Sequence, residues 1–157
     1  MGSRDTDELQ VRSLVAADFA AARAVADEWF GHPVGLSLHR LFFDQLGPSG
    51  LWIGEADGTM VGVLLGLRSE AEPDLAYVHF HMVDPVWRGA GVGSRLYREF
   101  GRRMHARGCR RVRALAAPSR DGSVRFHEAL GFGATGAPGY LGAGQDRLVF
   151  ERALPIP

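Results

Sequence analysis

Two histidines alternate with apolar residues in segment 75–83 of this 157-residue chain. The even positions are all apolar, whereas the odd positions carry aromatic and titratable side chains, among them Tyr77, His79 and His81. Because side chains alternate between the faces of a strand, this spacing predicts one core face and one face with both imidazoles. An imidazole, with an unperturbed pKa of about 6.5, is suited to proton transfer at neutral pH. Two alternatives stay open: hydrogen-bonded structural histidines, or a His-x-His metal site, for which no third ligand is evident.

A glycine-rich segment, Arg88–Ser94, follows this strand and leads into a predicted helix. Glycines let consecutive backbone N–H groups converge, and the unpaired amides of a helix N-terminus add the positive end of its dipole. Arg88 would add a charge-assisted fork from one side. The segment therefore predicts a phosphate-binding turn, although glycine-rich turns are also common in a chain with 21 Gly.

Two other phosphate-binding motifs are disfavoured. A Rossmann fingerprint requires the first turn of a parallel sheet and an acidic residue about 20 residues further on. Here the turn follows several strands, and the basic segment Arg110–Arg113 occupies that later position. A Walker A loop requires Lys, which this chain lacks entirely.

Hydrophobic periodicity and turn signals predict the elements that position these residues. Asp57-Gly58 between two apolar runs is a strong hairpin signal, and Pro85 ends the histidine strand. The predicted order is β-α-α-β-β-β-α-β-α-β-β, an α+β fold with a mixed sheet. The predicted strands are Glu8–Leu14, Leu51–Ala56, Thr59–Leu67, Leu75–Val83, Arg111–Ala117, Phe132–Ala137 and Arg147–Ala153, and the predicted helices are Ala16–Phe30, Leu36–Leu46, Val92–Arg107 and Asp121–Leu130.

The composition is that of one globular domain, which we expect to span residues 1–157. The formal net charge is zero, but residues 1–84 carry 13 acidic groups and 5 Arg, whereas residues 85–157 carry 5 acidic groups and 13 Arg. The second part is therefore expected to face a polyanion. Cys109 is the only cysteine, and the chain has neither a signal peptide nor a membrane-spanning run, so we expect a cytoplasmic protein without membrane association.

Two motifs in this order resemble those of the GNAT superfamily of acyl-CoA-dependent N-acyltransferases. The first is Val83-x-Pro85-x-x-Arg88-Gly89-x-Gly91-Val92-Gly93-x-x-Leu96, and the second is Phe126-His127-x-x-Leu130-Gly131-Phe132. With the order of elements, the resemblance covers most of the chain. It implies a single GNAT-like domain in which the central parallel strands splay apart.

The resemblance also implies that acetyl-CoA is the co-substrate and that no metal is needed. The turn would hold the pyrophosphate, and backbone groups of the preceding strand would contact pantetheine and the acetyl oxygen. Arg120 departs from the family, because similar members often have Asn there, and nearby serines are the expected replacements. The implied cofactor-binding residues are Met82, Val83, Arg88, Gly89, Gly91, Val92, Gly93, Ser94, Ser119 and Ser123.

Three histidines are the candidate catalytic residues. An alkylammonium with a pKa of about 10.4 costs roughly 4–5 kcal/mol to deprotonate at pH 7, so a base is needed. Many family members place that base four residues before the Val of Val-x-Pro, which is His79 here, and His81 would relay the proton. His127 stands where the family commonly carries a Tyr general acid, so it is the candidate acid in this chain.

The early helices and the last hairpin would form the acceptor pocket in the resembled fold. The candidate acceptor-binding residues are Glu28, Trp29, Phe30, Tyr77 and Tyr140. Asp27 and Asp44 lie nearby in the sequence, and an aromatic pocket rimmed by carboxylates favours a cationic amine. We therefore expect a small-molecule amine as the acceptor, with a protein or peptide amine as the alternative.

Other functions remain as alternatives to direct acetyl transfer in a ternary complex. The departure at His127 also allows a module that binds acyl-CoA without turnover. Nucleic-acid binding is not expected, because the Arg residues of segment 88–125 lack interleaved aromatic residues. A covalent acyl-cysteine on Cys109 is disfavoured by its distance from the turn in the predicted fold. Whether the chain forms a homodimer is left open.

Overall fold

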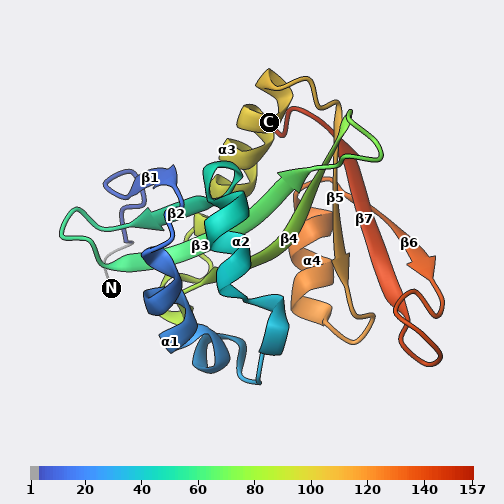
Figure 1. Cartoon of the computed structure of the whole chain (residues 1–157), viewed down its shortest axis with the longest axis horizontal. Helices are drawn as coiled ribbons and strands as arrows, with labels where there is room; N and C mark the ends of the chain where they lie inside the picture. The colour runs from blue at the N-terminus through green and yellow to red at the C-terminus, as the bar shows by residue number, and fades with distance from the viewer. Residues whose placement is uncertain (1–3) are drawn as a thin grey trace. The chain divides into compact units, whose positions relative to one another are not determined.

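A computed structural model describes residues 4–157, and it has the predicted order of elements (Figure 1). Three short 3-10 turns, η1 to η3, accompany them. The strands are β1 Gln10–Ser13, β2 Leu51–Gly54, β3 Met60–Arg68, β4 Leu75–Val83, β5 Arg111–Ala116, β6 Gly133–Ala137 and β7 Arg147–Ala153; the helices are α1 Asp18–Phe30, α2 Arg40–Leu46, α3 Val92–Ala106 and α4 Asp121–Ala129; the turns are η1 Gly35–Ser37, η2 Gly47–Ser49 and η3 Pro85–Trp87.

The strands form a mixed sheet in the order β1-β2-β3-β4-β5-β7-β6. Strands β1 and β2 pair antiparallel, as do β2 and β3 across the predicted Asp57-Gly58 turn. Strand β4 pairs parallel with β5, from Leu75 opposite Arg111 to Val78 opposite Ala114. Strand β7 pairs antiparallel with both β5 and β6. The predicted α+β class with a mixed sheet is confirmed.

The chain divides into two compact units. The first contains the chain up to Leu67 together with His79–Phe100, and the second contains Arg68–Val78 and Gly101–Pro157. Strand β4 and helix α3 each contribute residues to both units. The expectation of one domain over residues 1–157, and that of splayed central strands, stay predictions.

Helices α1 and α2 pack on strands of the first unit and form its main core (Figure 1). Small residues of α1 allow a close approach to the sheet, and Phe19 of α1 meets Phe43 of α2 edge to face at 5.4 Å between ring centroids. The buried members of this core include Ala22, Ala26, Phe43, Trp52, Val63, Leu65, Phe80 and Met82. This core holds the histidine strand by Phe80 and Met82.

The predicted helix Leu36–Leu46 is divided into η1 and α2. Leu38 and His39 between them have extended backbone, and Nδ1 of His39 accepts a hydrogen bond from the backbone N–H of Leu41 at 3.0 Å. This side-chain cap satisfies an otherwise unpaired amide of α2, which is why the helix begins at Arg40. The interruption leaves η1 as a separate turn that can carry a contact of its own.

The second unit has its core between α4 and strands β5 to β7. Phe150 and Val112 are fully buried, and Leu130 and Phe132 are nearly so. On strand β5, Arg111 bonds to Glu72, Asp74 and Glu151 at 3.1–3.2 Å. Arg113 adds a 2.8 Å ion pair with Glu151. These pairs link the segment before β4, strand β5 and strand β7.

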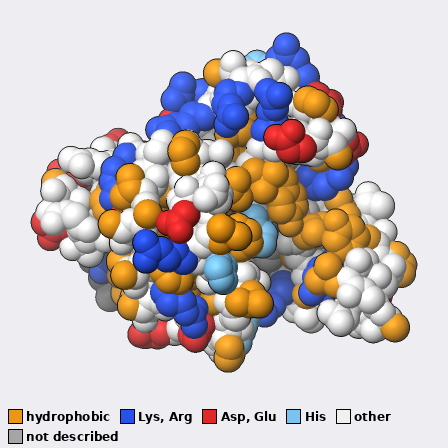
Figure 2. Space-filling model, in the orientation of Figure 1, with side chains coloured by type: hydrophobic (Ala, Val, Ile, Leu, Met, Phe, Trp, Pro, Cys, Tyr) orange, Lys and Arg blue, Asp and Glu red, His pale blue; other side chains and the backbone are white. Residues whose placement is uncertain are grey.

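Within residues 4–157, no helix is long and apolar enough to cross a membrane. Helix α3 is instead strongly amphipathic, with Leu96, Phe100 and Met104 buried as their spacing predicts. Arg side chains gather over this helix (Figure 2), and Arg98 and Arg102 are exposed. Arg95 is only partly exposed, and its guanidinium donates to the carbonyls of Thr6 and Leu9.

Gly62 of β3 offers a test of how closely the strands approach. A Cβ at Gly62 would lie 2.8 Å from the backbone oxygen of Met82, so β3 or β4 would have to shift. We expect Gly62→Ala to lower the free energy of unfolding by about 1–3 kcal/mol in urea titrations. Gly122→Ala in α4 is the control: no atom lies within 4 Å of its added Cβ, and the change should be neutral or stabilising. Equal effects of the two changes would contradict this account.

Candidate active site

Strand β4 has one buried face and one partly accessible face. Its even-numbered residues are buried with a relative exposure of 8% or less, whereas Tyr77, His79, His81 and Val83 are partly accessible. Phe80 and Met82 belong to the core against α1 and α2. The predicted alternation is confirmed, and both histidines lie on the partly accessible face.

His79 is held by the turn and the helix that follow α1. Its Nε2 lies 2.9 Å from the backbone oxygen of Ser37 in η1, and its ring lies 4.6 Å from that of Phe42 in α2. A carbonyl oxygen can only accept, so Nε2 carries the proton and donates it. In neutral His79 the lone pair is therefore on Nδ1. This arrangement fixes both the tautomer and the plane of the ring.

His81 lies against a buried tyrosine of α3. Its Nδ1 is 3.4 Å from the hydroxyl of Tyr97, and the two rings meet edge to face with centroids 5.1 Å apart. Tyr97 is only 1% exposed. Tyr97 was not among the predicted site residues, although its i, i+3, i+7 spacing with Phe100 and Met104 on the buried side of α3 indicates that it points inward.

The backbone N–H and C=O groups of successive residues in β4 also point alternately toward β3 and away from it. The N–H of Asp84 donates to the oxygen of Val61 in β3 at 2.8 Å, so Met82, two residues earlier, directs its backbone groups toward β3 as well. The close approach of Gly62 to the Met82 oxygen agrees with this direction. The backbone N–H of Val83 points away from β3. Of the two residues predicted to offer a backbone contact, Val83 is the better placed donor.

The turn after β4 has the geometry of an anion seat. The Asp84 carboxylate accepts from the N–H of Val86 at 3.0 Å and caps η3. Gly89 and Gly91 have φ of 76° and 88°, a conformation that L side chains rarely adopt. Added Cβ atoms there would meet nothing within 4 Å. The turn is therefore open in front of the first turn of α3.

The N-terminus of α3 supplies donors to this seat. The helix begins at Val92, so the N–H groups of Val92, Gly93 and Ser94 belong to its first turn, which contains no acidic residue. Arg88 adds an exposed guanidinium, and it donates to the backbone oxygen of Trp29. The residues predicted for phosphate binding thus adjoin one helix terminus.

The predicted acceptor residues on α1 form its last turn. Phe30 packs on Phe80 with centroids 5.0 Å apart, Trp29 is partly buried against the core, and Glu28 is exposed. The neighbouring carboxylate of Asp27 has a structural role: it pairs with Arg23 and accepts from the N–H of Val34. These bonds lower the pKa of Asp27, with the Arg23 bond as the larger cause. Of the two, Glu28 is therefore the carboxylate left to face a cation.

Tyr77 and Tyr140 belong to the second unit and lie close enough to interact. Burial raises the pKa of the Tyr77 phenol, and the charge of Tyr140 raises it further. Tyr140 is 54% exposed, on the loop between β6 and β7. Ser119 is exposed just before α4, and Ser123 lies in the first turn of α4. The two predicted tyrosines and the two predicted serines therefore all belong to the second unit.

His127 has a structural environment that was not expected from its motif. It is 2% exposed, its Nδ1 donates to the oxygen of Ser123 at 2.7 Å, and its ring stacks on Phe150 at 4.4 Å. Burial lowers the pKa of His127, although the bond to Ser123 opposes this effect. A general acid must carry a proton to give, so these surroundings make His127 unsuited to the role predicted for it.

Cys109 is also buried, and burial raises the pKa of its thiol. A reactive nucleophile needs a lowered pKa and access to its substrate. The environment of Cys109 is therefore that of a small packed residue. Among residues 4–157, no group of three or more His, Cys, Asp or Glu side chains is arranged to hold a metal ion.

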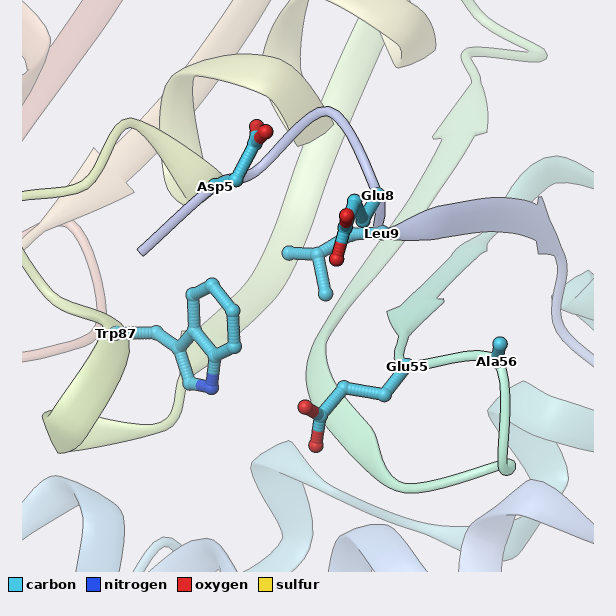
Figure 3. Close-up of a pocket in the computed structure, with 6 residues that line it drawn as sticks. All are labelled: Asp5, Glu8, Leu9, Glu55, Ala56 and Trp87. Carbon is cyan, nitrogen blue, oxygen red and sulfur yellow. The ribbon is translucent and has the colours of Figure 1, made fainter. Parts of the chain in front are cut away.

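An unpredicted pocket of about 250 Å³ lies beside η3. Figure 3 shows Asp5 and Glu8 of the N-terminal segment, Glu55 of the hairpin turn and Trp87 arranged around it. Arg4 fastens the N-terminal segment to η3: its guanidinium donates to the backbone oxygen of Val86 at 2.7 Å and lies 5.3 Å from the centre of the Trp87 ring. The pocket is lined by Asp5, Glu8, Leu9, Glu55, Ala56 and Trp87.

The family model of the Acetyltransferase (GNAT) family matches residues 16–132. This range is most of the chain and contains both the histidine strand and the glycine-rich turn. The chain therefore belongs to the GNAT family and is an acetyltransferase, as its motifs predicted. A search of curated protein sequences finds no match.

Solved structures confirm the fold. Ard1 from Thermoplasma volcanium has a TM-score of 0.79 at 21% identity, covering 94% of this chain and 98% of its own. Ribosomal-protein-S18-alanine N-acetyltransferase from Escherichia coli has a TM-score of 0.76 at 18% identity, with 95% and 96% covered. Diaminobutyrate acetyltransferase EctA from Paenibacillus lautus, solved with L-2,4-diaminobutyric acid and coenzyme A, has a TM-score of 0.73 at 18% identity, with 96% of both chains covered.

The environment of His127 predicts a pH effect on stability. Because its pKa is lowered in the folded state, the unfolded chain takes up a proton near pH 6.5 that the folded protein does not. This contribution to stability is present at higher pH and is lost as the pH falls, by up to about 1.4 kcal/mol per pH unit below the unfolded pKa. Urea titrations between pH 7.5 and 5.5 should show a smaller loss in His127→Gln than in wild type. The control is His105→Gln, which replaces a partly exposed histidine. An equal loss of stability in wild type and in His127→Gln would contradict the assignment.

Proposed function

We propose that this protein transfers an acetyl group from acetyl-CoA to a primary amine of a small molecule. The observation that carries the proposal is the placement of His79: its tautomer is set by Ser37, and it lies on the strand that runs directly into the open turn at Gly89 and Gly91. A base and an anion seat are thus built on one continuous segment.

The turn fits the diphosphate of CoA by its own donors. The amides of Val92, Gly93 and Ser94 and the guanidinium of Arg88 would hold it, with Gly89 and Gly91 leaving the approach open. Ser119 and Ser123 are proposed as further contacts, and Met82 as the residue that aligns β4. When bound, acetyl-CoA supplies the acetyl group as a thioester.

His79 would take the proton from the acceptor amine on Nδ1. Removing that proton at pH 7 costs roughly 4–5 kcal/mol for an ordinary alkylammonium, so the base must be oriented before the reaction. Ser37 and Phe42 provide this orientation. His81, against Tyr97, is the proposed second proton carrier on the same face of β4. The backbone N–H of Val83 would stabilise negative charge that develops on the acetyl oxygen.

We propose direct transfer in a ternary complex, because the buried Cys109 is unsuited to a covalent step. Glu28, Trp29 and Phe30 are the proposed acceptor-binding residues of the first unit, and Tyr77 and Tyr140 are those of the second. An exposed carboxylate beside aromatic rings suits a cation. A reducing cytoplasm is the proposed setting.

A protein or peptide amine is the second candidate acceptor. The similar structures include one enzyme named for a ribosomal protein and one solved with diaminobutyric acid, so the fold serves both kinds of acceptor. A non-catalytic acyl-CoA-binding module is the third possibility. It predicts binding of CoA without release of the thiol.

The role of His79 is tested by replacement. His79→Gln should lower kcat/KM by about 10²–10⁴-fold, since it removes the base, and should leave the Kd for CoA unchanged. Thiol release from acetyl-CoA measures the first quantity, and calorimetric titration with CoA measures the second. The control His105→Gln removes a histidine in the last turn of α3, whereas the proposed diphosphate seat adjoins the first turn of that helix. Full activity of His79→Gln would exclude His79 as the base.

The acceptor class is tested with a panel of amines. Thiol release should rise with at least one small cationic primary amine, and Glu28→Gln should raise its KM with little change in kcat, because the lost charge acts on binding. Acetylation restricted to peptide amines would reject the small-molecule proposal. CoA binding without thiol release from any member would favour the binding module.

A further inference from the structure

The C-terminal end of α1 has an excess of negative charge. Its last turn contains Asp27 and Glu28 and no basic residue, and the helix dipole adds partial negative charge there. Gly31, in the left-handed conformation, donates to the oxygens of Asp27 and Glu28, which closes the helix. Asp27 is paired with Arg23. The Glu28 carboxylate and the backbone carbonyls that follow it therefore need partners from outside α1.

Arg88 supplies the missing cation from 59 residues further along the chain. Its guanidinium donates to the oxygen of Trp29, as a basic side chain of the helix itself commonly does at such an end. Trp29 lies between Glu28 and Phe30, so the contact is made among the proposed acceptor-binding residues of the first unit. The backbone of Arg88 adjoins Gly89, at the start of the proposed diphosphate seat.

A guanidinium can donate to two acceptors at once. It has five N–H donors in a planar fork, of which the Trp29 oxygen uses only part. Arg88 is exposed, so its remaining donors can meet a phosphate. A Lys ammonium has a compact charge and lacks this two-sided geometry.

We propose that Arg88 couples the two halves of the substrate site: it caps α1 at Trp29 while it contacts the diphosphate of CoA. The inference rests on the proposed function. An anion beside Arg88 restricts its rotamers, which strengthens the cap and orders the end of α1 carrying Glu28, Trp29 and Phe30. CoA and acceptor therefore bind with positive coupling, and the factor is the same in both directions.

Hydrogen–deuterium exchange of the peptide covering residues 26–32 tests the coupling. In the free protein, Arg88→Ala should speed exchange of this peptide by roughly two- to fivefold, because the helix end loses its cap. In wild type, saturating CoA should slow it by about fivefold or more. For Arg88→Ala, the CoA concentration is raised until segment 89–94 is fully protected. The exchange rate of residues 26–32 in this variant should then be the same with and without CoA.

Two further variants control the experiment. Arg88→Lys keeps the positive charge and should retain protection of segment 89–94 while losing the slowing at residues 26–32. Arg4→Ala removes an arginine that contacts neighbouring Val86 but not α1, and it should behave as wild type at residues 26–32.

The inference is overturned if CoA slows exchange at residues 26–32 equally in wild type and in Arg88→Ala. It is also overturned if CoA protects segment 89–94 of wild type without any effect on α1. If CoA protects neither segment of wild type, the proposed function fails instead. The comparison of wild type with Arg88→Ala in free protein then still decides whether Arg88 caps α1.

Discussion

The alternation of β4 is the constraint on which the rest of the candidate site depends. Packing of Phe80 and Met82 against α1 and α2 fixes which side chains of the strand point away from the core. The same alternation directs the backbone of Met82 toward β3 and that of Val83 away from it. A shift by one residue would bury the imidazoles and turn the donor of Val83 into a sheet contact. Core packing thus sets the chemistry of the opposite face.

Local signals explain why so much of the fold could be predicted. Strand β4 and strand β7 have the predicted bounds, because alternating residues are bordered by turn residues in the sequence. The helix expected over Leu36–Leu46 was wrong in one respect, since a side-chain cap by His39 divides it. Helical spacing alone does not indicate whether a polar side chain turns back to its own backbone.

Long-range contacts explain what could not be predicted in the site. Ser37 and His79 are 42 residues apart, and Arg95 and Thr6 are 89 apart, so only the folded chain shows these partners. The position of His127 in its motif gives no sign that Phe150 of β7 stacks on its ring. A motif predicts where a residue lies along an element, whereas its protonation depends on what packs around it.

The choice of Arg at the turn has a chemical consequence. The side chain of Arg88 is a guanidinium, which is not a nucleophile at physiological pH. A Lys in the same place would release a free amine at moderate cost, and such an amine attacks thioesters. Under the proposed function, the arginine that binds acetyl-CoA therefore does not compete with the acceptor amine for the acetyl group. Because the chain contains no Lys, it also offers no side-chain amine for self-acetylation.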